Sequence, residues 1–236
     1  MLEGKKVLAI IPARGGSKRL KNKNILDLDG KPLIAHTIET ALQNKFIDKV
    51  IVSTDSDEIY GISELYGATS LLRPHEFSTD TASSVDVVIH AIAACEKFNE
   101  VFDVVILLQP TSPLRSSKDI TNAFKVFSAK KAKGVVSVCA CEHSPLWCNT
   151  LPNNHSMTDF ISKDLNSKRS QDLPFFYRVN GAIYICNIDD LRDKKTFLFE
   201  NVFASIMAIE NSVDIDEKSD FKYAEFLLEN NYQDEK

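Results

Sequence analysis

The first two thirds of the chain alternate between short apolar runs and longer stretches whose apolar residues recur at helical spacing. Residues 7–11, for example, are apolar at every position, which is typical of a strand buried on both faces of a sheet. Pro32 then opens a stretch with apolar residues on one helical face. The pattern predicts strands at 7–11, 50–52, 69–72, 103–108, 134–138, 182–185 and 203–209, and helices at 32–42, 57–66, 83–97, 116–127 and 221–228.

Strands that alternate with helices are typical of βαβ units, so we predict the α/β class, with a mostly parallel sheet and helices on both of its faces. The alternation stops at residues 142–177, which are polar, contain prolines and lack periodicity. A run this long without regular structure is unusual in a compact domain. We therefore predict one domain, residues 1–236, with an inserted arm at about 142–177 that packs on another surface, such as a partner subunit. A long solvated loop is the alternative.

The composition is that of a globular protein, with 44% hydrophobic and 26% charged residues in a chain of 236. Lys and Arg number 28 and Asp and Glu number 33, a net charge of −5. This balance argues against general nucleic-acid binding but leaves room for a local basic pocket that holds one phosphorylated ligand. The first apolar run is short and follows charged residues, so we expect no signal peptide, no membrane span and a cytoplasmic location.

The five cysteines predict reduced thiols rather than disulfides or a zinc site. Their number is odd, and three of them lie in strongly apolar runs. Cys139 and Cys141 form a C-x-C pair, and no second pair stands at the spacing of zinc ligands.

The segment after the first strand is a basic loop that contains two glycines. In parallel sheets, ligands bind beyond the carboxyl ends of the strands. Gly15 and Gly16 permit a tight turn whose N–H groups point inward, and Arg14, Lys18 and Lys23 add positive charge. A triphosphate needs this combination. The loop matches neither the Walker P-loop nor the dinucleotide fingerprint. A solvated charged turn is the alternative, which the acidity of the whole chain disfavours.

Other strand ends carry polar residues as well. Asp55 follows the second strand, where it would cap the next helix or bind a metal or a ribose. Arg73 follows the third strand and precedes a hydroxyl-rich run at 80–84, a helix start that favours an anion or a polar base edge. Two prolines hold Gln109, after the fourth strand, in place for a substrate. Arg115 would bond a phosphate or a carboxylate, or pair with an acidic surface residue.

Late in the chain, Asp214 and Asp216 alternate with an apolar residue. On extended backbone the two carboxylates lie on one face, about 6–7 Å apart. Two hard oxygen donors near a triphosphate suit Mg²⁺, which binds one or two carboxylates together with phosphate oxygens. A solvated acidic face before the last helix is the alternative.

Together these segments resemble the acylneuraminate cytidylyltransferases, the CMP-sialic acid synthetase family, over nearly the whole chain. Each motif is weak alone, and their ordered combination is specific. The matching motifs are RGGSK at 14–18 with Lys23 and Asn24, STD at 53–55, RP at 73–74, DTASS at 80–84, LQPTSPLR at 108–115, NGAIY at 180–184 and DID at 214–216. The resemblance implies an αβα nucleotidyltransferase (Rossmann-like) fold and a homodimer whose arm reaches over the partner's site. The implied reaction converts CTP and a nonulosonic acid into a CMP-sugar and pyrophosphate.

The resemblance also implies a role for each matching residue. The triphosphate would be held by Arg14, Ser17, Lys18, Lys23 and Asn24, and catalysis would depend on Arg14, Lys18, Lys23 and Asp216. Arg73 and Ser84 would recognise cytosine or its sugar. The nonulosonic acid would meet Gln109, Asn180, Tyr184 and Phe197, with Arg178 near the site and Arg169 on the arm. Asp214 and Asp216 would bind Mg²⁺.

Two alternatives stand beside this interpretation. The first is the same chemistry on another sugar acid, legionaminic or pseudaminic acid, which the sugar pocket rather than the nucleotide residues would decide. The second is a non-catalytic nucleotide-binding module on the same fold. The basic loop and the two aspartates, all retained in this chain, disfavour that second alternative.

Overall fold

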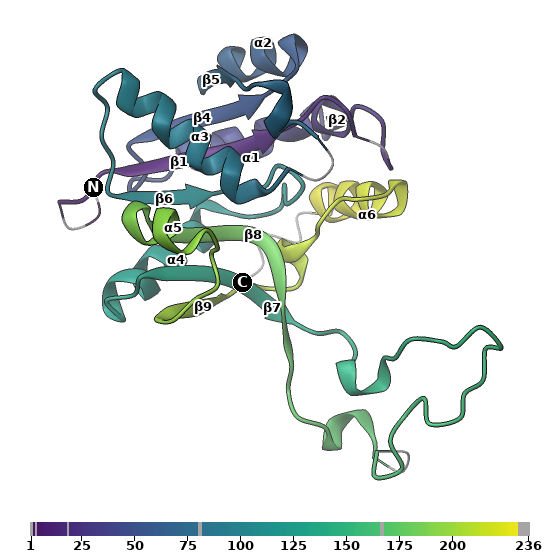
Figure 1. Cartoon of the computed structure of the whole chain (residues 1–236). Coiled ribbons are helices and arrows are strands. Elements are labelled where there is room, and N and C mark those ends of the chain that lie inside the picture. The colour runs from purple at the N-terminus through teal and green to yellow at the C-terminus, as the bar shows by residue number, and fades with distance from the viewer. Residues whose placement is uncertain (1, 3, 18, 80–81, 166–167, 231–236) are drawn as a thin grey trace.

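Seven strands form the central sheet, in the order β5-β4-β1-β6-β8-β7-β9 (Figure 1). The computed structural model describes residues 2, 4–17, 19–79, 82–165 and 168–230. Strand β8 lies antiparallel between β6 and β7, and the other neighbouring strands pair in parallel. The strands are β1 Val7–Ala13, β4 Lys49–Thr54, β5 Thr69–Leu72, β6 Val104–Leu107, β7 Gly134–Ala140, β8 Tyr177–Asn187 and β9 Val202–Ile206. A separate small hairpin joins β2 Asp27–Leu28 to β3 Lys31–Pro32.

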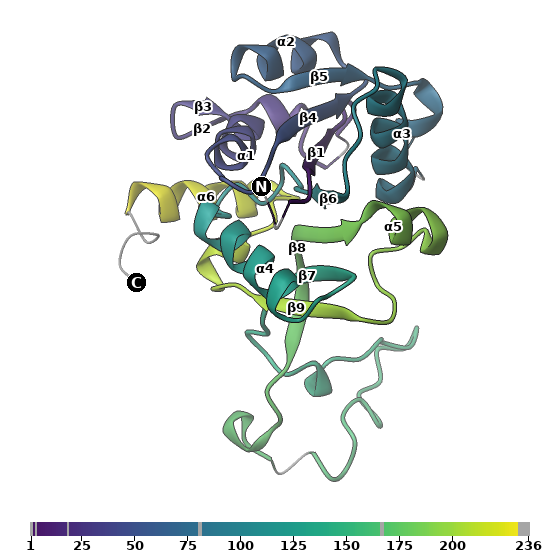
Figure 2. The ribbon, with the colours of Figure 1, turned by 90° about the vertical axis from the view of Figure 1, so that its left-hand side faces the viewer.

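Helices cover both faces of the sheet, which confirms the predicted α/β class (Figure 2). They are α1 Leu33–Leu42, α2 Asp57–Leu65, α3 Ser84–Lys97, α4 Ser117–Ala129, α5 Ile188–Lys194 and α6 Lys218–Glu229. Three of these helices are capped at their N-termini by serine. The hydroxyls of Ser56, Ser83 and Ser116 accept hydrogen bonds from backbone N–H groups of the first turn. Ser116 and Asp119 together form a capping box at the start of α4.

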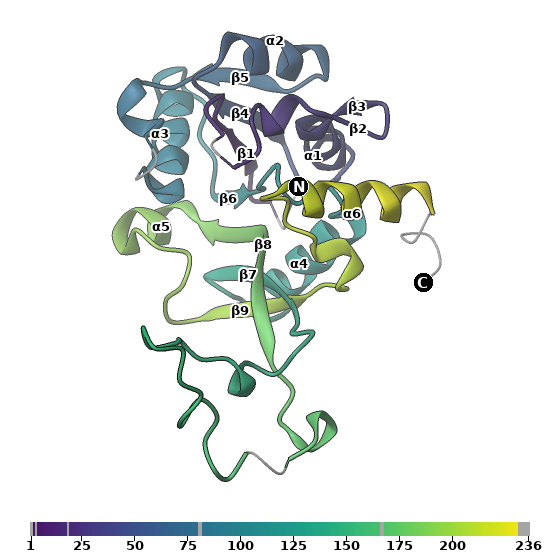
Figure 3. The same ribbon diagram turned by 90° about the vertical axis from the view of Figure 1, so that its right-hand side faces the viewer.

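The core lies on the two faces of β1, whose successive side chains point in opposite directions. Ala9 and Ile11 pack in one apolar cluster with residues of α1, α2 and α4. Leu8 and Ile10 pack in a second cluster with residues of α3 and α5. Figures 2 and 3 show α3 and α5 on one side of the sheet and α1 and α4 on the other.

A third apolar cluster fixes the C-terminal helix. Leu227 of α6 packs with Leu28 of the hairpin, Leu114 of the turn after β6, and Ile215. Because Ile215 separates the two aspartates of the late acidic pair, this cluster holds their backbone next to the β2–β3 hairpin and the turn after β6. The region around Ile215 is therefore part of the packed body of the protein.

Three features differ from the sequence-based expectation. The strand expected at 182–185 extends over Tyr177–Asn187 and runs antiparallel to its neighbours. Helix α5 and the β2–β3 hairpin were not expected, because each is short and carries charged residues between its apolar ones. An antiparallel strand that is buried on both faces has the same continuous apolar pattern as a parallel one, so the pattern alone does not show its direction.

The segment between β7 and β8 projects away from the sheet (Figure 1). Its regular structure in the described residues consists of two short 3-10 turns, Pro145–Trp147 and Ser170–Asp172. The segment coincides with the predicted insertion at 142–177. Its function as an arm on a partner subunit stays a prediction.

The five cysteines are unpaired, with Cys95, Cys139 and Cys186 buried in the body of the protein. Burial raises the pKa of the Cys186 thiol to about 12, and nearby Asp190 adds to the rise. In the described ranges, the helices are too short or too polar to cross a membrane.

Candidate nucleotide-binding site

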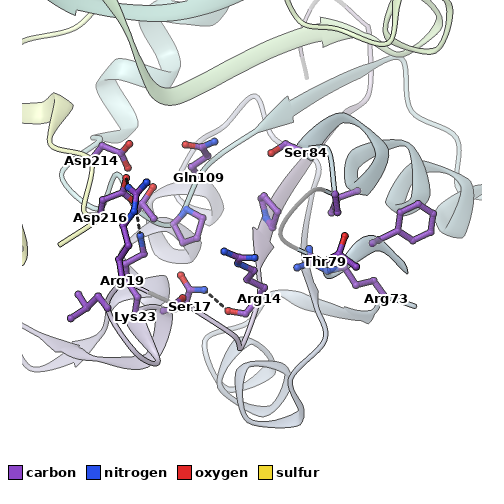
Figure 4. Close-up of a pocket in the computed structure, with 18 residues that line it drawn as sticks. Arg14, Ser17, Arg19, Lys23, Arg73, Thr79, Ser84, Gln109, Asp214 and Asp216 are labelled. Atoms are coloured by element: carbon purple, nitrogen blue, oxygen red, sulfur yellow. Dashed lines mark hydrogen bonds and ion pairs between the residues drawn. The ribbon is translucent and has the colours of Figure 1, made fainter. Parts of the chain in front are cut away.

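A cavity of about 650 Å³ opens at the carboxyl edge of the sheet (Figure 4). Its walls come from the loop after β1, the segment between β5 and α3, the turn after β6, and the loop before α6. Figure 4 shows Asp214, Asp216 and Lys23 on one side of the cavity, and Arg73 and Ser84 on the opposite side. The ends of β1, β5 and β6, three of the strand ends singled out in the sequence, thus meet in one cavity, as the parallel topology requires.

The loop after β1 contributes the basic wall. Arg14, Ser17 and Lys23 line the cavity, while the predicted Lys18 lies outside the described residues. Asn24, which also lines the cavity, donates its side-chain amide to the carbonyl oxygen of Arg14 at 3.0 Å. This hydrogen bond holds the loop in a closed turn.

Asp55 supports the same loop from the neighbouring strand. Its Oδ1 accepts a hydrogen bond from the Gly15 N–H at 2.9 Å. A side chain at residue 15 would bring its Cβ to 3.0 Å from the Cβ of Ser56, so the close approach of the two strand ends favours glycine at this position. Ser56, rather than Asp55, caps the next helix, so the capping role considered from the sequence is wrong. A contact of Asp55 with a metal or a ribose stays a prediction.

The basic and acidic segments meet directly. The Nζ of Lys23 lies 3.1 Å from Oδ1 of Asp216, and a guanidinium nitrogen of Arg19 lies 2.6 Å from its Oδ2. Lys23 also donates to the carbonyl oxygen of Ile215. Arg19 was not singled out from the sequence, although it belongs to the basic run 14–23 that was.

Asp214 lies beside this ion-paired group and opens on the cavity. The surrounding protein displaces water from its carboxyl group and raises its pKa, and the negative charge of Asp216 acts in the same direction. A hydrogen bond from Thr111 and the charge of Lys23 oppose the rise. The backbone next to Asp214 is held as well, because the Ile215 N–H donates to the Thr111 carbonyl at 2.8 Å.

The opposite end of the cavity combines one buried cation with apolar walls. Arg73 donates to the Ser53 carbonyl and, through Nε, to the Ser78 hydroxyl at 3.1 Å. Burial lowers the pKa of Arg73, although nearby Asp55 acts in the opposite direction. The side chains of Phe77 and Val87 line the cavity here.

Gln109 stands between the two ends, directly after β6. Gly181 of β8 lies close to its side chain and has a φ of +78°, in the left-handed region. A Cβ at residue 181 would lie 2.8 Å from Oε1 of Gln109 and 3.9 Å from Oδ2 of Asp214. The glycine therefore leaves room for the Gln109 side chain and places it close to Asp214.

Five predicted substrate contacts do not line this cavity in the described part of the chain. Tyr184 packs against Phe197 in a tilted arrangement with ring centroids 5.4 Å apart, in the apolar cluster that includes residues of α3 and α5. Burial raises the pKa of Tyr184, and the negative charge of Asp214 adds to the rise. Asn180 is buried, with 2% of its surface exposed.

The remaining two, both arginines, lie towards the projecting segment. Arg178 pairs with Glu142 at 3.4 Å, where β8 and β7 leave the sheet. Arg169 pairs with Asp172 at 3.0 Å on the projecting segment itself. Both ion pairs are exposed, so a ligand or a partner chain can compete for these arginines at little cost.

The oxygen donors of the cavity suit a metal ion that binds together with a phosphate ligand better than a metal ion that is bound by protein side chains alone. The described residues contain no group of three or more His, Cys, Asp or Glu side chains placed to hold a metal ion. Asp214 and Asp216 offer two carboxylates on one cavity wall. Two carboxylates completed by phosphate oxygens form a normal Mg²⁺ site, whereas two alone do not.

The fold and the cavity define an α/β protein with cationic and acidic side chains gathered in one cavity at the carboxyl edge of its sheet. The chain belongs to the cytidylyltransferase family, because a family model described as Cytidylyltransferase matches residues 8–235. An N-acylneuraminate cytidylyltransferase of Escherichia coli is 42% identical over 220 residues, which are 93% of this chain and 51% of that relative. The chain thus spans about half the length of that relative.

Other relatives match over their whole length. The CMP-N,N'-diacetyllegionaminic acid synthase of Legionella pneumophila is 37% identical over 97% of this chain and 98% of its own. A pseudaminic acid cytidylyltransferase of Campylobacter jejuni is 34% identical over the same shares. Among solved structures, a CMP:2-keto-3-deoxy-manno-octonic acid synthetase complexed with CTP has a TM-score of 0.73 at 19% identity. It covers 96% of this chain and 99% of its own, and it confirms the nucleotidyltransferase-like fold.

Proposed function

We propose that this protein transfers the CMP group of CTP to a nonulosonic acid, giving a CMP-sugar and pyrophosphate. The observation that carries the proposal is the ion pair of Lys23 with Asp216, which joins the basic loop and the acidic pair in one cavity. The relatives named above are cytidylyltransferases of N-acylneuraminate, legionaminic and pseudaminic acids. Their names support both the nucleotide and the class of sugar acid.

The proposed step is an in-line displacement at the α-phosphorus of CTP. A hydroxyl oxygen of the sugar acid bonds to that phosphorus while the bond to the bridging oxygen of pyrophosphate breaks. The hydroxyl proton is released, and pyrophosphate carries away the additional negative charge. Arg14, Lys18 and Lys23 neutralise the charge that develops on the leaving group, and the closed loop fixes its position.

Asp214 and Asp216 are the residues that would hold Mg²⁺ bound with CTP. When bound there, the ion supplies Lewis-acid polarisation of the phosphate oxygens. The phosphates of CTP compete with Asp216 for the cations Arg19 and Lys23. Nucleotide binding therefore frees the carboxylate oxygens that these cations occupy in the free protein.

The two sides of the cavity suit the two other parts of the substrates. We assign the cytosine and its ribose to the Arg73 and Ser84 side, where apolar side chains flank the buried guanidinium of Arg73. We assign the nonulosonic acid to the Gln109 side. Tyr184 and Phe197 would shape the wall of the cavity on this side without contacting the sugar acid directly. Arg178 would reach the sugar acid from the base of the projecting segment.

We further propose a homodimer through the 142–177 segment, with Arg169 carried to the partner's cavity. The segment ends in a row of exposed apolar residues that continues onto the sheet, including Phe175, Tyr177, Val179 and Ile206. Large exposed apolar patches mark interaction surfaces. The unpaired cysteines support a reducing compartment, so we place the reaction in the cytoplasm.

The test is pyrophosphate release from CTP and Mg²⁺ with a panel of N-acetylneuraminic, legionaminic, pseudaminic and 3-deoxy-octulosonic acids. We expect release with CTP but not with UTP or ATP, and with one nonulosonic acid well above the others. CTP binding without release for every sugar acid would instead support a non-catalytic module. The absence of CTP binding would refute the proposed function altogether.

A further inference from the structure

Asn180 sits at the bend of β8, and protein groups occupy its side-chain amide on both sides. Its Oδ1 accepts hydrogen bonds from the Ser137 hydroxyl at 2.6 Å and from the Ala182 N–H at 3.2 Å. Its Nδ2 donates to the Ser212 hydroxyl at 2.8 Å and to the Met207 sulfur at 3.4 Å. With these four partners and almost no exposed surface, the amide is a connector within the core.

Ser212 is the other end of this connection. It is fully buried, and its hydroxyl donates to the Ala208 carbonyl at 2.6 Å while it accepts from Asn180. Ser212 lies two residues before Asp214, at the start of the loop that carries both aspartates. Neither Asn180 nor Ser212 lines the cavity.

Asn180 also precedes Gly181, which faces the Gln109 side chain at close range. One buried amide thus connects the wall next to Gln109 with the loop of Asp214. A second anchor, the hydrogen bond from the Ile215 N–H to the Thr111 carbonyl, holds only the far side of that loop. On the near side, Asn211 donates to Asp119 of α4 at 3.0 Å, and the bond from Asn180 to Ser212 is the hydrogen bond that joins the loop to β8.

We propose that Asn180 and Ser212 are positioning residues that set the distance between the Gln109 wall and the carboxylates of Asp214 and Asp216. This inference rests on the proposed function, since it assigns the two walls to the sugar acid and to CTP with its metal. It gives Asn180 a role different from the sugar contact expected from the sequence. Misplacing a reacting group by about 1 Å costs on the order of a hundredfold in rate, so a buried anchor can matter as much as a direct contact.

The test uses Ser212→Ala, with Ser63→Ala as the matched control. Ser63 is equally buried and donates to the carbonyl four residues earlier at 2.7 Å, as Ser212 does, but it lies in α2, and its side chain does not line the cavity. We expect Ser212→Ala to lower kcat by about tenfold or more and to raise the Mg²⁺ concentration needed for half-maximal rate. KM for the sugar acid should change less than about twofold. Ser63→Ala should leave kcat, the Mg²⁺ dependence and KM for the sugar acid unchanged.

Two outcomes would overturn the proposal. One is a Ser212→Ala enzyme with the kcat and Mg²⁺ dependence of the Ser63→Ala control. The other is a rise in KM for the sugar acid alone, because that pattern belongs to a direct sugar contact. If Ser212→Ala does not fold, Ser212→Cys keeps the volume and weakens the hydrogen bond, and the same two comparisons apply to it.

A second readout does not depend on catalysis. Amide hydrogen exchange of residues 213–217 should be faster in Ser212→Ala than in wild type, and unchanged in Ser63→Ala. If wild type releases no pyrophosphate but exchange at residues 213–217 is faster in Ser212→Ala, the proposed function is wrong and the positioning role of Asn180 and Ser212 is still supported. Equal exchange in the two variants would overturn the anchor whatever the activity.

Discussion

Lys23 and Asp216, which are 193 residues apart in the chain, form an ion pair of 3.1 Å across the carboxyl edge of the sheet. The lysine side chain is 11% exposed and the aspartate side chain 49% exposed, so the pair stands at the border of the cavity rather than in bulk solvent. Such a pair is stronger than a fully exposed one, yet water and ligands still reach it. A triphosphate that enters the cavity brings charge that competes for the lysine.

The first prediction concerns the carboxylate of this pair. Asp216→Ala should lower kcat by on the order of a hundredfold or more, because the variant loses one of the two oxygen donors at the phosphate end. CTP should still bind with an affinity near that of wild type, since Lys23 and Arg19 are released to contact its phosphates. Steady-state kinetics and calorimetry of CTP binding measure the two effects separately.

The control for this variant is Asp190→Ala. Asp190 also pairs with a distant lysine, Lys133, at 2.9 Å, but it belongs to α5, and its side chain does not line the cavity. It should keep the kcat of wild type. Wild-type turnover in Asp216→Ala would remove the acidic pair from the mechanism.

The frame of the sheet could be predicted from the sequence because buried strands are continuous apolar runs. The candidate site could be predicted in part, because parallel topology brings strand ends such as Arg14, Arg73 and Gln109 to one edge. What could not be predicted are contacts between residues that are distant in sequence. Examples are the support of Gly15 by Asp55 and the burial of Asn180 against Ser212. Local patterns carry no information about which of several polar residues turns into the core.

A second prediction follows from the close approach of Gly181 to Gln109. Gly181→Ala would force a side chain into the left-handed region and bring its Cβ to 2.8 Å from Oε1 of Gln109. The backbone strain alone costs about 1–2 kcal/mol of stability. The displaced Gln109 should raise KM for the sugar acid more than KM for CTP. Denaturant unfolding and kinetics with each substrate varied measure these effects.

The matched control is Gly61→Ala. Gly61 lies within α2 with no atom near the added Cβ, so alanine should raise the free energy of unfolding by about 0.5–1 kcal/mol. An unchanged KM for the sugar acid in Gly61→Ala, beside a raised one in Gly181→Ala, assigns the effect to the cavity wall. Equal kinetics in the two variants would contradict the assignment of Gln109 to the sugar acid.

The third prediction concerns the pH dependence of stability. Because the pKa of Asp214 is raised in the folded protein, the folded state holds this proton more tightly than the unfolded chain does. Its contribution to stability is complete below the unfolded pKa and is lost as pH rises through the folded pKa. We therefore expect Asp214→Asn to be more stable than wild type at neutral pH, with a gap that closes as the pH falls to about 4.

Asp190 should show the opposite pH dependence of stability. Burial acts to raise the pKa of Asp190, but hydrogen bonds from Lys133 and Asn187 outweigh it and lower the pKa. The stability that Asp190 contributes is present above its unfolded pKa and is lost as pH falls through the folded one. Asp190→Asn should thus be less stable than wild type at neutral pH, and thermal unfolding at several pH values compares the two variants. If both variants were more stable than wild type at neutral pH, or both less stable, the electrostatic explanation would be contradicted.

The last prediction tests the projecting segment as a dimer arm. Phe175 is 76% exposed, and its ring centroid lies 5.5 Å from that of Tyr177, where the segment joins β8. An aromatic pair of this size is a typical anchor of an interface. We expect wild type to sediment as a dimer, and Phe175→Ser to shift the equilibrium towards monomer and to lose activity in parallel. Phe98→Ser is the control, because Phe98 is 79% exposed but follows α3 in the body of the protein. A monomeric wild type, or the same loss in both variants, would leave the segment without a role in assembly.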